Sequence, residues 1–246
     1  MGRLIILSGP SCVGKSSLHK ALLRLYPEFA ARLQKLVLYA SRPPRPGERE
    51  GIDYHFRSRD AIERLRDKPG FTVIDVRGDL QAVSQDDLQH ALSCGEAFVE
   101  GNPFIGLVLL HQLRSPETQA VSAFMAPLSK DEIRFLQSVQ PAISLSNFVA
   151  DVMRRKLLRR AQRQKGVLAE VDLAEVERRA MSAYAEMKLA CQFDYVLPNH
   201  DGEDSDNWDA FYFPVGDARR ALLAFRALVE GTEPRDAERW EPDLLA

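Results

Sequence analysis

The chain opens with a short, uninterrupted apolar run, then a glycine-rich turn, then a helical pattern of leucines. Leu4–Leu7 contains only leucine and isoleucine and ends at Ser-Gly-Pro, which is typical of a strand buried on both faces of a parallel sheet. From Leu18 to Leu25, leucine recurs at intervals of four and three residues, and Pro27 follows shortly after. This spacing predicts an amphipathic helix that ends near the proline.

Strand and helix patterns continue to alternate beyond this first unit. Short apolar runs predict strands at residues 54–56, 71–76, 97–99, 121–126 and 193–197. Apolar stripes at helical spacing predict two long helices between residues 149 and 187, the second beginning at Asp172 with Glu175 completing an acidic capping box. A last helix is expected over 217–230, closed by Gly231. The alternation predicts an α/β fold with a parallel sheet flanked by helices.

Three segments between or after these elements are predicted to be irregular. Residues 41–51 hold three prolines together with arginine, glycine and glutamate, so this loop should be stiff. Residues 200–209 form an acidic loop, for which a solvated surface is favoured over a cation site. The segment from Trp240 onward is interpreted as a tail of undefined role.

Composition narrows the class of protein. The 246 residues include 33 Lys and Arg against 35 Asp and Glu, a net charge of −2 that gives no overall attraction to nucleic acid or to an anionic membrane. No apolar stretch in the sequence reaches 18 residues, so membrane anchoring is not expected. The three cysteines show no CxxC pair, which favours a reducing, cytoplasmic compartment. The oligomeric state stays open.

Residues 9–16, GPSCVGKS, match the phosphate-loop (P-loop) pattern G-x-x-x-x-G-K-[ST] at every fixed position, between the predicted strand and helix. There, backbone N–H groups and the helix N-terminus can hold phosphate oxygens. Lys15 would reach the β- and γ-phosphates of ATP, and the Ser16 hydroxyl would bind Mg2+. Less favoured alternatives are a glycine turn that binds nothing and, for the filler residue Cys12, an oxidation that blocks the loop. The predicted nucleotide-binding residues of this segment are Gly9, Ser11, Cys12, Val13, Gly14, Lys15, Ser16 and Ser17.

A second candidate anion site lies in the stiff loop. Arg42 and Arg45 are three residues apart there, and Tyr54 follows on the next predicted strand. Two guanidinium groups on a proline-rich loop can bind one phosphate with little loss of chain entropy. We therefore expect a site for the phosphate of an acceptor molecule, with a solvated Arg/Pro loop as the alternative.

Together these two motifs resemble those of the guanylate kinases. That family has GPSGxGKS followed by (S/T)RxPRxGExxGxDYxF, and this chain has GPSCVGKS and SRPPRPGEREGIDYHF. The likeness extends to MAPLS at 125–129, to ERR at 177–179 with Glu186, and to DYVLPN at 194–199. The resemblance implies a P-loop kinase core (1–35, 94–135 and 186–246), a small mixed insert that binds the nucleoside monophosphate acceptor (36–93), and a helical lid (136–185). An insertion is expected near residues 139–165.

The resemblance also implies roles for single residues. Lys15, Arg42 and Arg179 would serve catalysis, Arg179 by contacting the transferring phosphates, and Asn199 would lie near the ATP adenine. ATP and Mg2+ are the implied cofactors, and a small phosphorylated molecule is the implied partner. The implied substrate-binding residues are Arg42, Arg45, Glu48, Tyr54, Thr72 and Gln81, and the implied metal-binding residues are Ser16 and Glu100.

Several positions depart from the family pattern where the guanine base is read. Thr72 stands in place of a glutamate and Leu38 in place of a serine. DLQA at 79–82 replaces NYYG and loses a phosphate-binding tyrosine. Asp75 cannot simply replace the glutamate, because it lies three residues past Thr72 and should face the opposite side of an extended strand.

Further departures affect the metal site and the lid. EGN at 100–102 replaces Asp-Ile-Asp, and Glu100 is expected to compensate for the carboxylate lost at Asn102. An early lid arginine falls on the apolar Leu136. Residues 154–165 carry seven basic side chains out of twelve. Closure of this segment over the phosphates and a solvated helix face are equally favoured, with phosphate contacts to nucleic acid as a minor alternative.

Three functional hypotheses follow. The first is an ATP- and Mg2+-dependent transfer of the γ-phosphate to a nucleoside monophosphate, with GMP as first candidate and another phosphorylated small molecule as a variant. The second is a nucleotide-binding module with decayed catalysis, motivated by Asn102 and the lost tyrosine. The third is a P-loop protein that binds RNA through its basic helix.

Overall fold

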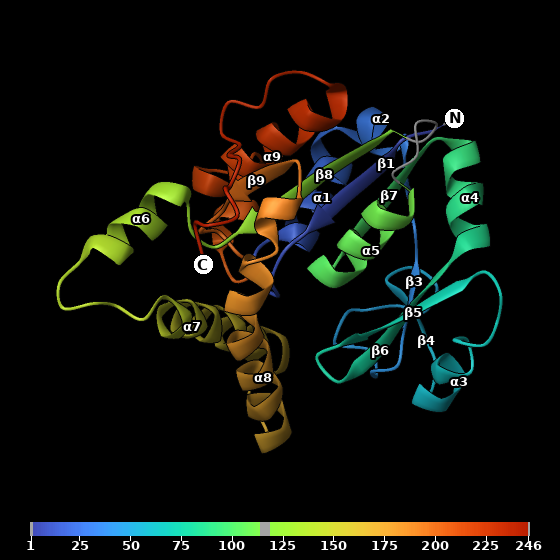
Figure 1. The fold of residues 1–246 in the computed structure, drawn as a ribbon, viewed down its shortest axis with the longest axis horizontal. Coiled ribbons are helices and arrows are strands. Elements are labelled where there is room, and N and C mark those ends of the chain that lie inside the picture. The colour runs from blue at the N-terminus through green and yellow to red at the C-terminus, as the bar shows by residue number, and fades with distance from the viewer. Residues whose placement is uncertain (1, 114–118, 246) are drawn as a thin grey trace.

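The main sheet of the molecule has five parallel strands in the order β2-β7-β1-β8-β9, with helices on both faces (Figure 1). The computed structural model describes residues 2–113 and 119–245. The strands are β1 (Leu4–Ser8), β2 (Leu33–Lys35), β7 (Glu96–Gly101), β8 (Ala120–Ala126) and β9 (Tyr195–Pro198). The predicted α/β fold with a parallel sheet flanked by helices is confirmed.

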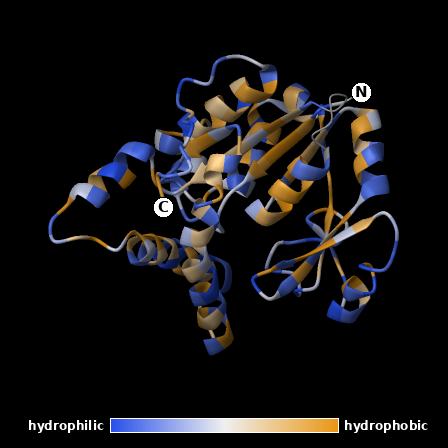
Figure 2. Cartoon of the chain, viewed as in Figure 1, coloured by the Kyte–Doolittle hydropathy of each residue, from blue (hydrophilic) through white to orange (hydrophobic). Residues whose placement is uncertain are grey.

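Strand β1 lies at the centre of the main sheet, and all its residues are buried. Because side chains alternate across a strand, Ile5 and Leu7 pack on α1 and α9, whereas Leu4 and Ile6 pack on α5. A strand covered on both faces needs no polar alternation, which explains the uninterrupted apolar run and the hydrophobic strands in Figure 2. The helices around this sheet are α1 (Lys15–Leu25), α2 (Pro27–Ala30), α4 (Gln85–Cys94), α5 (Pro103–Leu113) and α9 (Gly216–Glu230).

A second sheet of four strands, in the order β4-β3-β6-β5, is formed between β2 and α4. Its strands are β3 (Leu38–Ala40), β4 (Tyr54–Phe56), β5 (Phe71–Val76) and β6 (Asp79–Ser84). Leu80 and Ala82 pack on Ile62 of α3 (Arg59–Glu63), on the outer face. The strand register places a different set on the inner face, which packs toward α5: Leu38, Thr72, Ile74, Gln81 and Val83.

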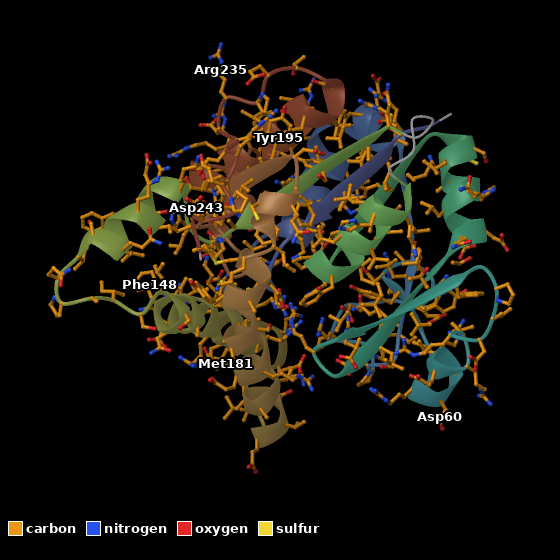
Figure 3. The ribbon with its side chains drawn as sticks, in the orientation of Figure 1. Asp60, Phe148, Met181, Tyr195, Arg235 and Asp243 are labelled. Carbon is orange, nitrogen blue, oxygen red and sulfur yellow. The ribbon has the colours of Figure 1, made fainter. Side chains whose placement is uncertain are left out.

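A pair of long helices, α7 (Leu145–Lys165) and α8 (Glu170–Met187), follows α6 (Lys130–Ser138). Figure 1 shows the pair projecting from the same side of the main sheet as the second sheet, and Phe148 and Met181 mark the two helices in Figure 3. The expected start of α8 at Asp172 is wrong. Asp172 occupies the third helical position, where its carboxylate accepts a hydrogen bond from the backbone N–H of Ala169, the N-cap residue.

The C-terminal segment closes the open edge of the main sheet beside β9. Glu238 pairs with Val196 through two backbone hydrogen bonds of 2.8 Å. Trp240, Leu244 and Leu245 are then buried in the core on the α5 side of the sheet. The segment interpreted from sequence as a tail is therefore part of the hydrophobic core, and it protects a strand edge that would otherwise be unpaired.

The predicted and observed bounds of the strands agree closely, but some strands were not predicted. Strands β4 and β5 have the predicted bounds, and the predicted β7, β8 and β9 differ at their ends by up to two residues. Strands β2, β3 and β6 were not predicted from the sequence. Among the helices that the structure describes, none is long and apolar enough to cross a bilayer.

Candidate active site

The P-loop between β1 and α1 wraps around the ammonium group of Lys15. Its Nζ atom donates hydrogen bonds to the carbonyl oxygens of Gly9 (2.8 Å) and Pro10 (2.7 Å), and the side chain is buried. Burial lowers the pKa of Lys15 from its ordinary value. Gly14 has φ of 107°, and a Cβ atom there would lie 2.5 Å from Nδ2 of Asn199, so both conformation and space require glycine. The loop thus places a cation at the N-terminus of α1.

Cys12 is part of the P-loop backbone rather than a reactive group. Its φ of 65° is uncommon for a residue with a side chain, and the residue is 2% exposed. Burial raises the pKa of the Cys12 thiol to about 12, so the thiolate that oxidation requires is scarce at neutral pH. Burial and the raised pKa both disfavour the alternative in which oxidation of Cys12 blocks the loop.

Ser16 and Glu100, the two implied metal-binding residues, lie side by side at the ends of α1 and β7. The Ser16 hydroxyl donates a 2.5 Å hydrogen bond to Oε1 of Glu100, and Nδ1 of His19 is 3.6 Å from Oε2. Burial opposes ionisation, but the hydrogen bonds from His19 and Ser16 hold the pKa of Glu100 at about 2. A hydroxyl and an ionised carboxylate are hard oxygen ligands that suit Mg2+, which is commonly bound by one or two protein groups plus phosphates. The described residues contain no group of three or more His, Cys, Asp or Glu that could hold a metal ion.

Arg42 and Glu48 form the centre of the proline-rich loop. The Arg42 guanidinium binds both carboxylate oxygens of Glu48 at 2.6 and 2.7 Å and stacks over the rings of Tyr54 and Phe56. Arg42 is 8% exposed, and the backbone N–H of Arg45 donates to the same carboxylate at 2.8 Å. These contacts pre-form the loop, so ordering it around a ligand costs little chain entropy.

Arg45 and Arg179 meet at one carboxylate, that of Glu175 on α8. Nη2 of Arg45 and Nε of Arg179 lie 3.2 and 3.3 Å from the same oxygen. Burial and then Arg42 lower the pKa of Arg45 to about 10, while burial, Arg45 and Arg160 hold the pKa of Arg179 well below its ordinary value. Because Arg45 and Arg179 share one carboxylate and Arg179 is buried, this cluster is suited to an anion such as a phosphate.

The inner face of the second sheet is the surface where an acceptor base would be read. Thr72 Oγ1 accepts a hydrogen bond of 3.0 Å from Gln112 of α5, and Leu38 is buried against Gly101. Gln81 is 7% exposed, and its Oε1 meets no hydrogen-bond partner among the described residues. Asp75 lies on the opposite face, where it accepts from the backbone N–H of Gly78. The predicted orientation of Asp75 away from Thr72 is thus confirmed.

Asn102, where the family has a carboxylate, immediately precedes helix α5. Its Oδ1 accepts a hydrogen bond of 2.9 Å from the backbone N–H of Phe104, as a helix N-cap does. Its Nδ2 is buried and has no hydrogen-bond partner within the described part of the chain. The amide therefore keeps a structural contact and leaves one buried donor available.

The acidic loop that follows β9 lies against the basic stretch of α7. Lys156 and Arg159 approach Asp204 at 3.7 and 3.5 Å, and Lys156 also donates to the carbonyl oxygen of His200. Two more ion pairs join the same helix and loop, Arg160 with Glu203 and Arg163 with Asp206. The helix and the loop therefore neutralise each other in part, while Arg159, Arg163 and Asp206 stay largely exposed, so closure over the phosphates and a solvated face both stay predictions.

Asn199 holds the P-loop to the chain that follows β9. Its Nδ2 donates to the carbonyl oxygens of Val13 (2.7 Å) and Asp201 (2.6 Å), and the residue is fully buried. Both amide hydrogens are therefore used within the protein. The proximity of Asn199 to the nucleotide loop is clear, whereas its placement beside an adenine stays a prediction.

Sequence reasoning missed Arg77 altogether. Arg77 lies at the tip of the β5–β6 hairpin and binds Glu186 of α8 through two hydrogen bonds of 2.6 and 2.7 Å. It also donates to Ser11 of the P-loop at 3.1 Å. No local pattern could reveal this residue, because its partners lie 66 and 109 positions away.

Comparison with known proteins agrees with the motifs. The guanylate kinase family model matches residues 1–76. The guanylate kinase of Vibrio cholerae is 30% identical over 247 residues, covering 100% of this chain and 92% of that protein. The guanylate kinase of Alkalilimnicola ehrlichii is 29% identical over 238 residues, covering 96% of each chain. The crystal structure of guanylate kinase from Anaplasma phagocytophilum has a TM-score of 0.50 at 21% identity, over 81% of this chain and 78% of that chain, and so shares the fold. With its P-loop, its arginine loop and this likeness along the whole chain, the protein belongs to the guanylate kinase family.

Proposed function

We propose that this protein transfers the γ-phosphoryl group of ATP to a nucleoside monophosphate, with GMP as the first acceptor. Membership of the guanylate kinase family supports this function. The observation that carries it is the meeting of Arg45 and Arg179 at Glu175, because it joins the acceptor loop to the lid helix. Arg77 in turn connects that helix to the P-loop. The two anion-binding loops therefore serve one reaction site.

Phosphoryl transfer requires positioning of the reactants and neutralisation of charge, not a covalent nucleophile. Lys15 would leave the carbonyl oxygens of the P-loop and pair with the β- and γ-phosphates. Arg42 and Arg45 would orient the acceptor phosphate, and Arg179 would neutralise charge that develops on the transferring group. Mg2+ held by Ser16 and Glu100 would supply further neutralisation of the phosphate oxygens.

Different parts of the chain would bind the acceptor, form the lid and bind ATP, as in a nucleoside monophosphate kinase. We assign residues 36–93 to acceptor binding and residues 136–185 to the lid, around a core of 1–35, 94–135 and 186–246. The separate second sheet and the projecting α7–α8 pair support this division. The Ser16–Glu100 contact across α1 and β7 supports a core that binds ATP and Mg2+.

A second candidate is the same transfer to a phosphorylated acceptor other than GMP. The inner face of the second sheet favours it, because Thr72 is bound to Gln112 and Leu38 is apolar and buried. Among the residues described on that face, Asp79 is the only carboxylate, and it lies 3.6 Å from Arg178. A guanine base presents N–H donors that a carboxylate matches better than an amide or a hydroxyl does.

A coupled ADP-release assay decides between these functions. ATP and Mg2+ are held constant while GMP, AMP, CMP, UMP and a set of phosphorylated sugars are offered in turn. We expect saturable turnover with at least one acceptor and its loss in Lys15→Met and Arg42→Ala. ATP binding without turnover on any acceptor would contradict both candidates and favour a nucleotide-binding module.

A further inference from the structure

Arg77 occupies a backbone conformation that its residue type does not favour. The β5–β6 hairpin turns at Arg77 and Gly78, whose φ angles are 58° and 83°. Two-residue turns with both φ values positive favour Asn, Asp and Gly, and a long side chain gains nothing locally from this geometry. The reason for an arginine at the first position must therefore lie in what its side chain contacts.

The Arg77 side chain leaves its own sheet and joins two other parts of the molecule. Its Nε and Nη2 atoms bind the two carboxylate oxygens of Glu186 at 2.6 and 2.7 Å, and Nε also donates to Ser182 at 2.8 Å. Its Nη1 atom donates to the Ser11 hydroxyl in the P-loop at 3.1 Å. One guanidinium group thus connects the second sheet, helix α8 and the P-loop.

The contact between Arg77 and Glu186 is buried, so it requires an arginine at position 77. The side chain of Glu186 is 1% exposed and that of Arg77 is 13% exposed, so the carboxylate is removed from water and depends on the guanidinium for its charge balance. An arginine matches a carboxylate through two parallel hydrogen bonds, and a lysine cannot reproduce that geometry. The hairpin tip is therefore held in one position relative to α8.

Arg77 also lies close to the groups proposed to act on the phosphates. Burial is the larger cause of the lowered pKa values of Lys15 and Arg179, and the charge of Arg77 contributes to both. The hairpin tip, the lid helix and the donor loop therefore converge at the place where the two phosphates would meet.

We propose that Arg77 is a positioning residue for phosphoryl transfer, which docks the tip of the acceptor-binding sheet onto the P-loop through Ser11 and onto α8 through Glu186. The expected change in kcat and in acceptor KM rests on the proposed function. The docking of the hairpin is a property of the protein without substrates. Loss of Arg77 should therefore release the hairpin and misalign the acceptor while leaving ATP bound.

The test compares Arg77→Ala and Arg77→Lys with Arg59→Ala in the full chain. Arg59 is the matched control, because it binds the carbonyl oxygen of Gly78 from the exposed outer side of the same hairpin. Hydrogen–deuterium exchange is followed in peptides covering 71–84 and 8–16, with a β1 peptide as reference for global opening. Acceptor KM, kcat and ATP affinity are measured in parallel.

We expect at least tenfold faster exchange in both peptides for Arg77→Ala, with β1 unchanged, and a smaller effect for Arg77→Lys. We also expect kcat to fall at least tenfold while ATP affinity stays within threefold. Exchange equal to that of Arg59→Ala would overturn the proposal, and so would faster exchange with unchanged kcat and KM. If the unaltered protein turns over no acceptor, the proposed function fails, and the exchange data alone decide whether Arg77 docks the hairpin.

Discussion

The Ser16 hydroxyl donates a hydrogen bond of 2.5 Å to Oε1 of Glu100, joining the first turn of α1 to the end of β7. Together with His19, this contact keeps a carboxylate ionised beside the P-loop although it is largely buried. The position matters because the family motif has its first carboxylate here and its second at Asn102 in this chain. If Mg2+ binds at this site as proposed, Glu100 is the carboxylate expected to hold it.

Replacing Glu100 by Gln should raise the Mg2+ concentration needed for half-maximal turnover by at least tenfold, because an amide oxygen carries no charge. A titration of turnover against Mg2+ at fixed ATP measures this. Since the pKa of Glu100 is about 2, the Mg2+ requirement of the unaltered protein should show no ionisation of this group between pH 5 and 9. Equal Mg2+ requirements in Glu100→Gln and the unaltered protein would rule out its role at the metal.

Replacing Thr72 by Glu should improve the use of GMP relative to other acceptors by about tenfold in kcat/KM, which corresponds to about 1.4 kcal/mol. The reason is that the new carboxylate would lie on the inner face of the second sheet and could accept hydrogen bonds from a base. Asp75→Asn, which alters the outer face of the same strand, is the control and should leave the preference unchanged. No gain for GMP in Thr72→Glu would mean that the base does not contact this face.

The contact between α7 and the acidic loop should contribute to stability mainly through Asp204, whose side chain is 3% exposed and pairs with Lys156 and Arg159. Asp204→Asn removes the charge from a buried pair and should lower the free energy of unfolding by about 3 kcal/mol. The matched control is Asp206→Asn, because Asp206 is 74% exposed and its pairing with Arg163 should be worth less than about 1 kcal/mol. Urea denaturation measures both values, and equal losses would contradict a buried contact.

His200 should make the stability of the protein depend on pH near neutrality. Burial lowers its pKa, but hydrogen bonding to Asp217 and the charge of Glu132 outweigh burial and raise it above 6.5. A raised pKa in the folded state stabilises the protein below the unfolded value of 6.5, and this contribution is lost as pH rises through the folded pKa. The difference in Tm between the unaltered protein and His200→Gln should therefore be largest near pH 5 and shrink by pH 9. A difference that is constant with pH would exclude this effect.

The sequence was most informative where short stretches determine their own structure. The P-loop could be recognised because its glycines, lysine and serine act within eight residues, between a strand and a helix with clear patterns. The arginine loop could also be singled out, because its arginines and prolines lie within one short stretch, whereas the pairing of Arg42 with Glu48 was not predicted. The start of α8 was placed two residues late, because an acidic residue that caps a helix from its third position resembles an N-cap in sequence.

The sequence by itself therefore determined the fold class, the P-loop and arginine-loop motifs and the family, since each motif depends on residues that are close together in the chain. Only the tertiary structure decided that Arg77 reaches Glu186, that α7 neutralises the acidic loop and that the C-terminal segment closes the sheet. The physical reason is that these contacts join positions from 42 to 109 residues apart, and their strength comes from burial, which no local pattern reports.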